Sequence, residues 1–343
     1  MFRPTLFAAL LASTFAAHAA TSKPLTATQV LNQLNVVSLD TINSQSHVDG
    51  RTWAAGSVTG GDYGQHLSSA PASSYAGLTA GGSASNLHVN GGGAVVGGSL
   101  ANATVNSGAS VVKGGVANTN FNGAAYVAGT ASSTNFNGGR ATSPTTAMQA
   151  SSAAATSTDF GKVLGNLSTA MSTLKSTDSK VTMQGNKAVF NAKPNSSGVA
   201  VFDLTAIDEQ LFKLGEFQFN LNGATTVILN TDVKTASISA NFLGGGAQAI
   251  GSKTIWNFYD ATNLTIGSQF GGAVLATDAL LTNYQNIEGG VYVHDLKQYG
   301  EIHLQAFTGN VDFVAAAVPE PDTVALLLAG LAVIGAVRLR RRG

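Results

Sequence analysis

The sequence has no cysteine in 343 residues and carries few charges. Without cysteine the chain can form no disulfide, no thiol nucleophile and no thiolate metal site. Charged residues make up 10% of the chain, against about 25% in an ordinary globular domain. Lys and Arg together number 18, as do Asp and Glu, which gives a formal net charge of +0 at pH 7. This balance, with no basic stripe, excludes nucleic acid as a partner.

Acidic residues are missing altogether from one long stretch. No Asp or Glu occurs from Tyr63 to Thr158. Glycosidases need paired carboxylates, and calcium sites need clustered ones. The stretch therefore holds no carboxylate-based active site. It also cannot be the aspartate-bearing, calcium-binding type of β-helix.

The acidic residues elsewhere are scattered. In "VFDLTAIDEQLF", Asp203 stands apart, while Asp208 and Glu209 are typical of a turn or a helix start; a substrate or metal site there is the less favoured alternative. Serines are abundant, but none occupies a Gly-x-Ser-x-Gly turn. We therefore predict that the protein is not an enzyme, with no catalytic residue and no cofactor.

The histidines suggest one possible cluster. His294 and His303 lie near Asp295 and Glu301 in the sequence, and they could approach one another across adjacent strands. Isolated histidines on strands more often pack or face solvent than bind a ligand. We therefore predict no metal site.

The N-terminus has the layout of a secretory signal peptide. Arg3 supplies a positive charge, residues 6–17 are almost wholly apolar, and small residues follow at Ala17-His18-Ala19. The run is too short to span a membrane comfortably. We assign residues 1–20 to a signal peptide, and the alternative is a buried N-terminal helix.

The C-terminus combines three features in a distinctive order. Pro319-Glu320-Pro321 precedes an apolar run over 323–337, and a basic cluster closes the chain: Arg338, Arg340, Arg341 and Arg342. The prolines break what comes before, and the arginines should stay cytoplasmic under the positive-inside bias. Residues 318–343 resemble the PEP-CTERM sorting signal, with an ordinary single-pass anchor as the alternative.

This resemblance implies a partner and a location. The partner is an exosortase-type membrane protease that processes the tail. The apolar run would hold the chain transiently in the inner membrane of a Gram-negative bacterium. The protein would then reach the cell surface or the extracellular matrix.

Between these signals, residues 21–317 contain a repeat. The phrase Thr-Asn-Phe-Asn-Gly at 119–123 returns at 134–138, and the repeat places three residue types at spacings of 15 or 16. The apolar residues, which should face inward, are Val89, Val105, Phe121 and Phe136. Each is followed by an asparagine that we expect in a structural ladder at a corner: Asn90, Asn106, Asn122 and Asn137. Seven positions before each apolar residue stands a glycine: Gly82, Gly98, Gly114 and Gly129.

A unit this short cannot bury its own apolar face, but a stack of units can. Asn and Gly also tolerate the positive φ that sharp corners need. The repeat therefore predicts a mainly β fold, a right-handed β-helix or solenoid with coils of about 15–16 residues. Ordinary antiparallel hairpins and a disordered linker are the alternatives.

A different pattern interrupts the repeat. Apolar residues at positions 160, 163, 164, 167, 171 and 174 recur at threes and fours, as on one face of a helix. We predict a long α-helix over about 145–177, or two shorter ones, packed along the solenoid. Strand-like segments resume at Lys180 and should continue the same body to about Phe313.

With these residues in view, the segment from about Leu31 to Phe313 resembles the choice-of-anchor A domain. The matching segments are "LNVVSLDTINSQSHVDGRTWAAGSV", the glycine-rich repeats, "IWNFYDATNLTIGSQFGGAVLATDALLTNYQNIEGGVYV" and "GEIHLQAF". The resemblance implies a β-helical, surface-exposed and adhesive domain. It assigns no catalytic residue.

Binding is thus the function class that the sequence favours. We expect a ligand-facing ladder on the repeat: Thr104, Thr119, Asn120, Thr134 and Asn135. Amides and hydroxyls in register would suit an extracellular polysaccharide or another matrix polymer. A purely structural surface coat and an ice-binding-like solenoid are the alternatives. Aromatic residues beside the ladder, such as Tyr75 and Tyr126, would favour sugar, and a strict Thr-x-Thr array would favour ice.

Overall fold

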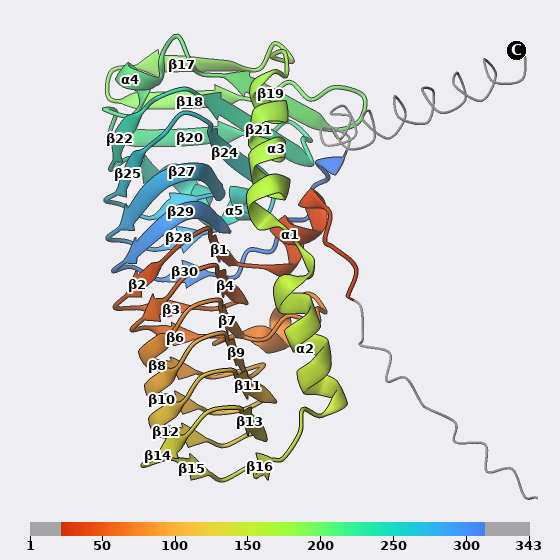
Figure 1. Ribbon diagram of the computed structural model, residues 1–343. Helices are drawn as coiled ribbons and strands as arrows, with labels where there is room; N and C mark the ends of the chain where they lie inside the picture. The colour runs from red at the N-terminus through yellow and green to blue at the C-terminus, as the bar shows by residue number, and fades with distance from the viewer. Residues whose placement is uncertain (1–21, 313–343) are drawn as a thin grey trace, which may run out of the picture.

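The repeats fold into short parallel strands stacked rung upon rung (Figure 1). The computed structural model describes residues 22–312. Leu100 pairs with Ala84 on one side and with Val116 on the other, one repeat unit away in each direction. The repeat region forms β7 Leu78–Ala80, β8 Ala84–Val89, β9 Ala94–Val96, β10 Leu100–Val105, β11 Ser110–Val112, β12 Val116–Phe121, β13 Ala125–Val127, β14 Ala131–Ser132, β15 Asn135–Phe136 and β16 Arg140–Ala141.

Two similar coils precede the repeats. They contain β1 Val36–Ser38, β2 Ile42–Ser44, β3 His47–Val48, β4 Thr52–Ala54, β5 Val58–Thr59 and β6 Asp62–Tyr63, followed by the 3₁₀ turn η1 Leu67–Ser69. Together β1 to β16 are called the N-terminal half below.

The chain beyond residue 179 forms the C-terminal half. Its strands are β17 Lys180–Gln184, β18 Lys187–Asn191, β19 Val199–Asp203, β20 Glu216–Asn220, β21 Thr226–Thr231, β22 Thr235–Ile238, β23 Asn241–Phe242, β24 Thr254–Phe258, β25 Asn263–Ile266, β26 Phe270–Gly271, β27 Ala273–Asn283, β28 Ile287–Glu288, β29 Val291–Gln298 and β30 Ile302–His303. Short helices α4 Asp208–Leu211 and α5 Gly246–Gly251, with η2 Leu243–Gly245, lie between them. Within residues 22–312 only β17 and β18 pair antiparallel.

The order of rungs differs from the order of the chain. The first strand, β1, lies between β4 and β29, with Val36 in register with both Thr52 and Val291. The N-terminal half therefore starts in the middle of the stack and runs to one end (Figure 1). The chain then crosses to the other end and returns through β17 to β30. Both halves form one continuous body, as the sequence predicts.

Coil length is not uniform along the stack. Val199 pairs with Thr226, and Val227 pairs with Thr254, so a rung of β19, β21 and β24 takes far more chain than a rung of the repeats. The predicted spacing holds in the repeats, from β8 through β10 to β12, but not throughout the N-terminal half, where Thr52 pairs with Leu78. It is also too short for much of the C-terminal half. The repeat pattern could not reveal this, because the longer coils contain no repeated phrase.

Two helices carry the chain back along one side of the stack (Figure 1). They are α2 Thr146–Ser157 and α3 Phe160–Ser172, so the prediction of one long helix over 145–177 is wrong. Thr158 is extended, and the Asp159 side chain accepts a hydrogen bond from the Lys162 amide as the N-cap of α3. The Thr158 hydroxyl accepts from the Tyr75 hydroxyl at 3.0 Å, which fixes the break to the solenoid.

Apolar side chains form two main layers. The first fills the interior of the coils from Val36 to Ile302. The second lies outside the sheet, where α3 and the N-terminal helix α1 (Ala27–Gln33) cover Ile228, Ile255 and Leu275. Helix α2 packs more thinly, with Ala155 against Val95. The helices therefore remove one side of the solenoid from solvent and leave the other sides exposed.

Candidate functional site

An asparagine ladder runs along one corner of the N-terminal half. The side-chain amides of Asn106, Asn122 and Asn137 each donate to the carbonyl oxygen of the asparagine one rung back, at 2.7, 3.3 and 2.8 Å. Asn90 accepts the first of these bonds. The four predicted corner asparagines thus stack on one another and close the turns.

A second asparagine ladder was not predicted. Asn86, Asn102 and Asn118 have φ of 57°, 51° and 47°, and their amides bond in series at 3.0 and 3.2 Å. Each occupies a left-handed corner, a conformation that asparagine tolerates better than most residues. Their recurrence every 16 residues in three successive repeat units was the available signal.

The predicted ligand-facing ladder divides into two sets. Thr104, Asn120 and Asn135 lie in one register column, with Asn135 donating to Asn120 at 2.7 Å. Thr119 instead is in register with Ala103, is 1% exposed, and donates its hydroxyl to the Ala117 carbonyl. Thr134 makes the equivalent bond to Ser132. Thr119 therefore does not lie on the surface, because alternate residues of a strand point to opposite faces.

A longer polar surface lies on the neighbouring side of the solenoid. Its outward side chains follow one register column through ten rungs and both halves, and none of them is buried. We call this column the polar row: Ser237, Thr265, Thr282, Lys297, Asn43, Thr59, Ser85, Ala101, Ala117 and Ser132. At about 4.8 Å per rung it extends roughly 43 Å. Most of its members are small and polar, and no local pattern predicts the row because its members come from distant segments.

Two exposed tyrosines stand beside the polar row. Tyr284 and Tyr299 are 53% and 43% exposed, and their rings stack at 5.2 Å with an angle of 9° between planes. Each follows a member of the polar row, Thr282 or Lys297, by two residues. The stack therefore presents an aromatic surface at the edge of the row.

Two other tyrosines, Tyr75 and Tyr126, were candidates for an aromatic surface beside the ladder, but they lie elsewhere. Tyr75 is 5% exposed and packs against Phe160 of α3. Tyr126 is in register with Val111, on the side where α2 lies. Neither residue lies beside Thr104, Asn120 and Asn135.

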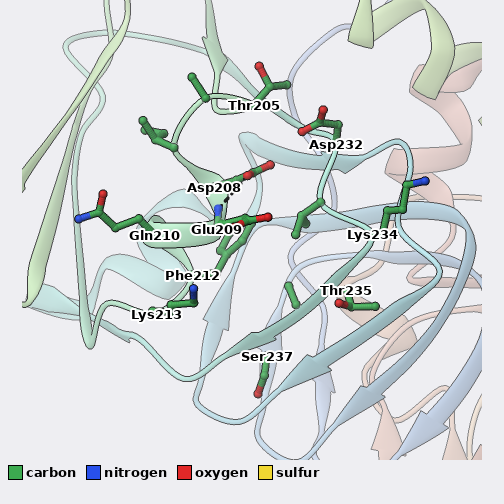
Figure 2. A pocket seen from close by; sticks show the side chains of 14 residues that line it. Thr205, Asp208, Glu209, Gln210, Phe212, Lys213, Asp232, Lys234, Thr235 and Ser237 are labelled. Atoms are coloured by element: carbon green, nitrogen blue, oxygen red, sulfur yellow. Dashed lines mark hydrogen bonds between the residues drawn. The ribbon is translucent and has the colours of Figure 1, made fainter.

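An open groove is found in the C-terminal half, between α4 and residues 232–237 (Figure 2). Asp208 is 3% exposed, and its carboxylate accepts the Thr231 hydroxyl at 2.6 Å and the Glu209 amide at 2.7 Å. Partial burial and the nearby Asp208 carboxylate raise the pKa of Asp232. Lys213 and Lys234 also line the groove. Asp208 and Glu209 stand in the first turn of α4, where Asp208 bonds the chain around it.

The histidines fall into separate clusters. His294 contacts Asp295 at 2.8 Å, whereas His303 contacts Glu288 at 2.8 Å and Glu301 at 2.7 Å. Burial alone would lower the pKa of His303, but its hydrogen bonds with Glu301 and Glu288 outweigh this and raise the pKa. The structure thus does not bring His294 and His303 into one cluster. It places His47 beside His303 instead.

The signal peptide (1–20) and the sorting residues from Pro319 to Arg342 lie outside the described residues. Within 22–312, no helix is both long and apolar enough to span the hydrocarbon core. Residues 317–342 match the model of the PEP-CTERM protein-sorting motif, which agrees with the predicted tail and implies processing by an exosortase. The motif marks the chain as an exported surface protein.

Residues 27–304 match a family model described as "Putative Ice-binding-like adhesive domain". No curated protein and no solved structure matches the chain. The family match covers the solenoid from α1 to β30, and thus most of the sequence. The chain therefore belongs to the ice-binding-like adhesive domain family.

Proposed function

We propose that this exported protein is a non-catalytic adhesin that binds an extracellular polysaccharide along the polar row. The Tyr284–Tyr299 stack would hold sugar rings, and the row would hydrogen-bond to the hydroxyls of an extended chain. The observation that carries the proposal is this exposed aromatic pair at the edge of a regular polar surface.

The aromatic pair favours sugar over other ligands. Tyrosine combines an apolar ring with a polar tip, which suits the apolar faces and hydroxyl edges of a sugar. Among the described residues, these two tyrosines are the only large hydrophobic side chains that are exposed. The polar row adds hydroxyl and amide groups at a constant spacing, which suits a polymer with repeating units.

Ice is the second candidate ligand. The family match and the small polar side chains favour it, since an ice surface also repeats regularly. The row is not a strict Thr-x-Thr array, however, because Lys297 interrupts its middle and Ala101 and Ala117 lie near its end. We therefore place sugar first, and a purely structural surface coat after both.

Several finer assignments belong to the same proposal. The chain would be of the choice-of-anchor A kind, with right-handed coils, and would be exported by a Gram-negative bacterium. Its tail would hold it transiently in the inner membrane before release to the surface or matrix. Its lack of catalysis is supported by the stretch 64–158 without Asp or Glu and by an Asp208 carboxylate that already bonds Thr231 and the Glu209 amide.

The test is binding of the full chain, purified in mild detergent, to a glycan array and to bacterial extracellular polysaccharide. We expect Tyr284→Ala with Tyr299→Ala to weaken binding by roughly 10-fold to 100-fold, at about 1.4 kcal/mol per tenfold. The pair Tyr284→Phe and Tyr299→Phe should keep most of the affinity, because the rings still stack. Tyr126→Ala, on the helix side, is the matched control.

Other results would point elsewhere. Loss of binding in the Thr104→Ala, Asn120→Ala, Asn135→Ala variant, but not in the tyrosine variant, would move the site to the predicted ladder. Thermal hysteresis abolished by Thr59→Tyr and unchanged in the tyrosine variant would favour ice. A folded protein that binds no glycan and shows no hysteresis would leave the surface-coat function.

A further inference from the structure

Histidines and carboxylates alternate where the two halves of the solenoid meet. Strand β3 of the N-terminal half pairs with β30 of the C-terminal half through Val48 and Ile302. His47 and Asp49 flank Val48, and Glu301 and His303 flank Ile302. The two short strands therefore place two histidines and two carboxylates on adjacent rungs.

Three of these side chains converge on one point. One ligand atom from each of His47, Glu301 and His303 lies within 4.8 Å of the other two. Glu301 stands between the histidines, with one oxygen 2.7 Å from Nε2 of His303 and the other 3.7 Å from Nδ1 of His47. Ligand atoms around a tetrahedral zinc ion, at bonds of about 2.0–2.2 Å, lie roughly 3.4 Å apart. Small side-chain rotations would bring the three atoms to that distance.

The other nitrogen of each histidine already faces a carboxylate. Nδ1 of His303 is 2.8 Å from Glu288, which is 2% exposed and also accepts from Gln269 at 2.7 Å. Nε2 of His47 lies 3.6 Å from Asp49, which is beyond hydrogen-bond distance. That Asp49 oxygen contacts Nδ1 of His66 at 2.7 Å, and the other accepts the Leu304 amide at 3.0 Å. Histidine ligands of metals nearly always have such a partner, which fixes the ring and raises its basicity. A buried, hydrogen-bonded Glu288 is the second observation that points to a metal.

We propose that His47, Glu301 and His303 bind one divalent transition-metal ion, with Zn²⁺ the best match. Imidazole ligands favour zinc and its neighbours over Mg²⁺ and Ca²⁺, which prefer oxygen. The three ligands leave a fourth position for water. The ion joins residues 47 and 303, near the start and the end of the solenoid, and so clamps its two halves together.

The test is calorimetric titration of the metal-free full chain with Zn²⁺ in detergent at pH 7.5. We expect one ion per chain with a micromolar or tighter Kd, and a rise in Tm of several degrees on binding. His47→Ala and His303→Ala should each weaken binding by more than tenfold. Glu288→Gln should weaken it by about tenfold, because Glu288 contacts the outer nitrogen of His303 and is not itself a ligand. Co²⁺ should give the visible spectrum of a tetrahedral site, and that spectrum should vanish in His47→Ala.

The matched control is His88→Ala. His88 likewise contacts a carboxylate, Asp62 at 2.6 Å, but it is more exposed and belongs to no such cluster among the described residues. Its loss should leave affinity and stoichiometry unchanged. Circular dichroism of each metal-free variant separates loss of a ligand from loss of the fold. No Zn²⁺ binding by the wild type, or equal binding by a folded His47→Ala variant, would overturn the proposal.

Discussion

The N-terminal and C-terminal halves of the solenoid fill their interiors with different side chains. In the N-terminal half the inward positions hold mostly small aliphatic residues such as Val89, Val105 and Val112. In the C-terminal half they hold Trp256 surrounded by phenylalanines: Phe190, Phe212, Phe217, Phe219, Phe258 and Phe270. Stacked asparagines are 15 or 16 positions apart in the repeats, whereas Asn257 and Asn230 on neighbouring rungs β24 and β21 are 27 apart.

The difference shows how coil length and core composition depend on each other. A longer coil encloses a wider cross-section, which only large side chains can fill at normal packing density. A shorter coil leaves little room, so glycine and asparagine must form tight corners. We call the C-terminal half the wide half and the N-terminal half the narrow half. Each should be sensitive to a different kind of substitution.

The largest effect is expected in the wide half. Trp256 is 0% exposed, and its indole N–H donates to the Gly271 carbonyl at 2.9 Å. Trp256→Ala should cost about 3–5 kcal/mol of unfolding free energy, because it leaves a large cavity. Val112→Ala, in the narrow half, should cost about 2 kcal/mol. Urea denaturation measures both, and equal costs would contradict the proposed difference between the cores.

The narrow half should be more sensitive to added volume. A Cβ atom at Gly114 would lie 2.6 Å from the carbonyl oxygen of Gly98 on the next rung. Gly114→Ala should therefore cost about 1–3 kcal/mol, since rungs at a fixed spacing cannot separate locally. The control is Gly165→Ala in α3, where no atom lies within 4 Å and the change should stabilise by about 0.5–1 kcal/mol. Thermal melts of the two variants should shift in opposite directions.

The corner ladders should contribute less per residue. Asn102 has φ of 51° and bonds to Asn86 and Asn118. Asn102→Ala should cost about 1 kcal/mol through loss of exposed hydrogen bonds and left-handed strain. Asn102→Gly should relieve the strain but not restore the bonds, so its Tm should fall between those of the wild type and the alanine variant. A glycine variant less stable than the alanine variant would show that the corner conformation is not the cause.

The smallest effect on stability is expected at the junction between the halves, where it should be seen only at acid pH. Partial burial alone would raise the pKa of Asp295 on β29, but hydrogen bonds from Thr41, before β2, and from His294 outweigh this and lower it. A carboxyl with a lowered folded pKa stabilises fully above its unfolded pKa of about 3.9, and the effect is lost as pH falls through the folded value. Tm should fall below about pH 4, and less steeply in Asp295→Asn.

The acid result has a direct control. Asp178→Asn changes an exposed carboxyl whose partner, Lys193, lies in the C-terminal half away from the junction. If Asp178→Asn flattens the acid profile as much as Asp295→Asn, the junction has no special role in acid stability.

Much of the narrow half could be predicted from its sequence. The spacing of Val89, Val105 and Phe121 predicted the rung, and the following asparagines predicted the corner ladder, because stacked identical coils place identical residues on each other. The same reasoning failed for Thr119. It looks equivalent to Asn120 in composition, but the pleat turns their side chains to opposite faces. The sequence left open whether the helical segment is one helix or two, because the break depends on a bond from Tyr75, which is distant in the chain.

By itself, the sequence determined the stacking of short parallel strands, the helical segment beside them and the exported, surface-sorted character of the protein. These follow from local periodicity and from signals read in linear order. Only the tertiary structure decided which distant residues meet: the ten members of the polar row, the Tyr284–Tyr299 stack and the His47–Glu301–His303 cluster. The physical reason is that β1 and β3 pair with β29 and β30, at the opposite end of the described chain, and no local pattern encodes a pairing over that distance.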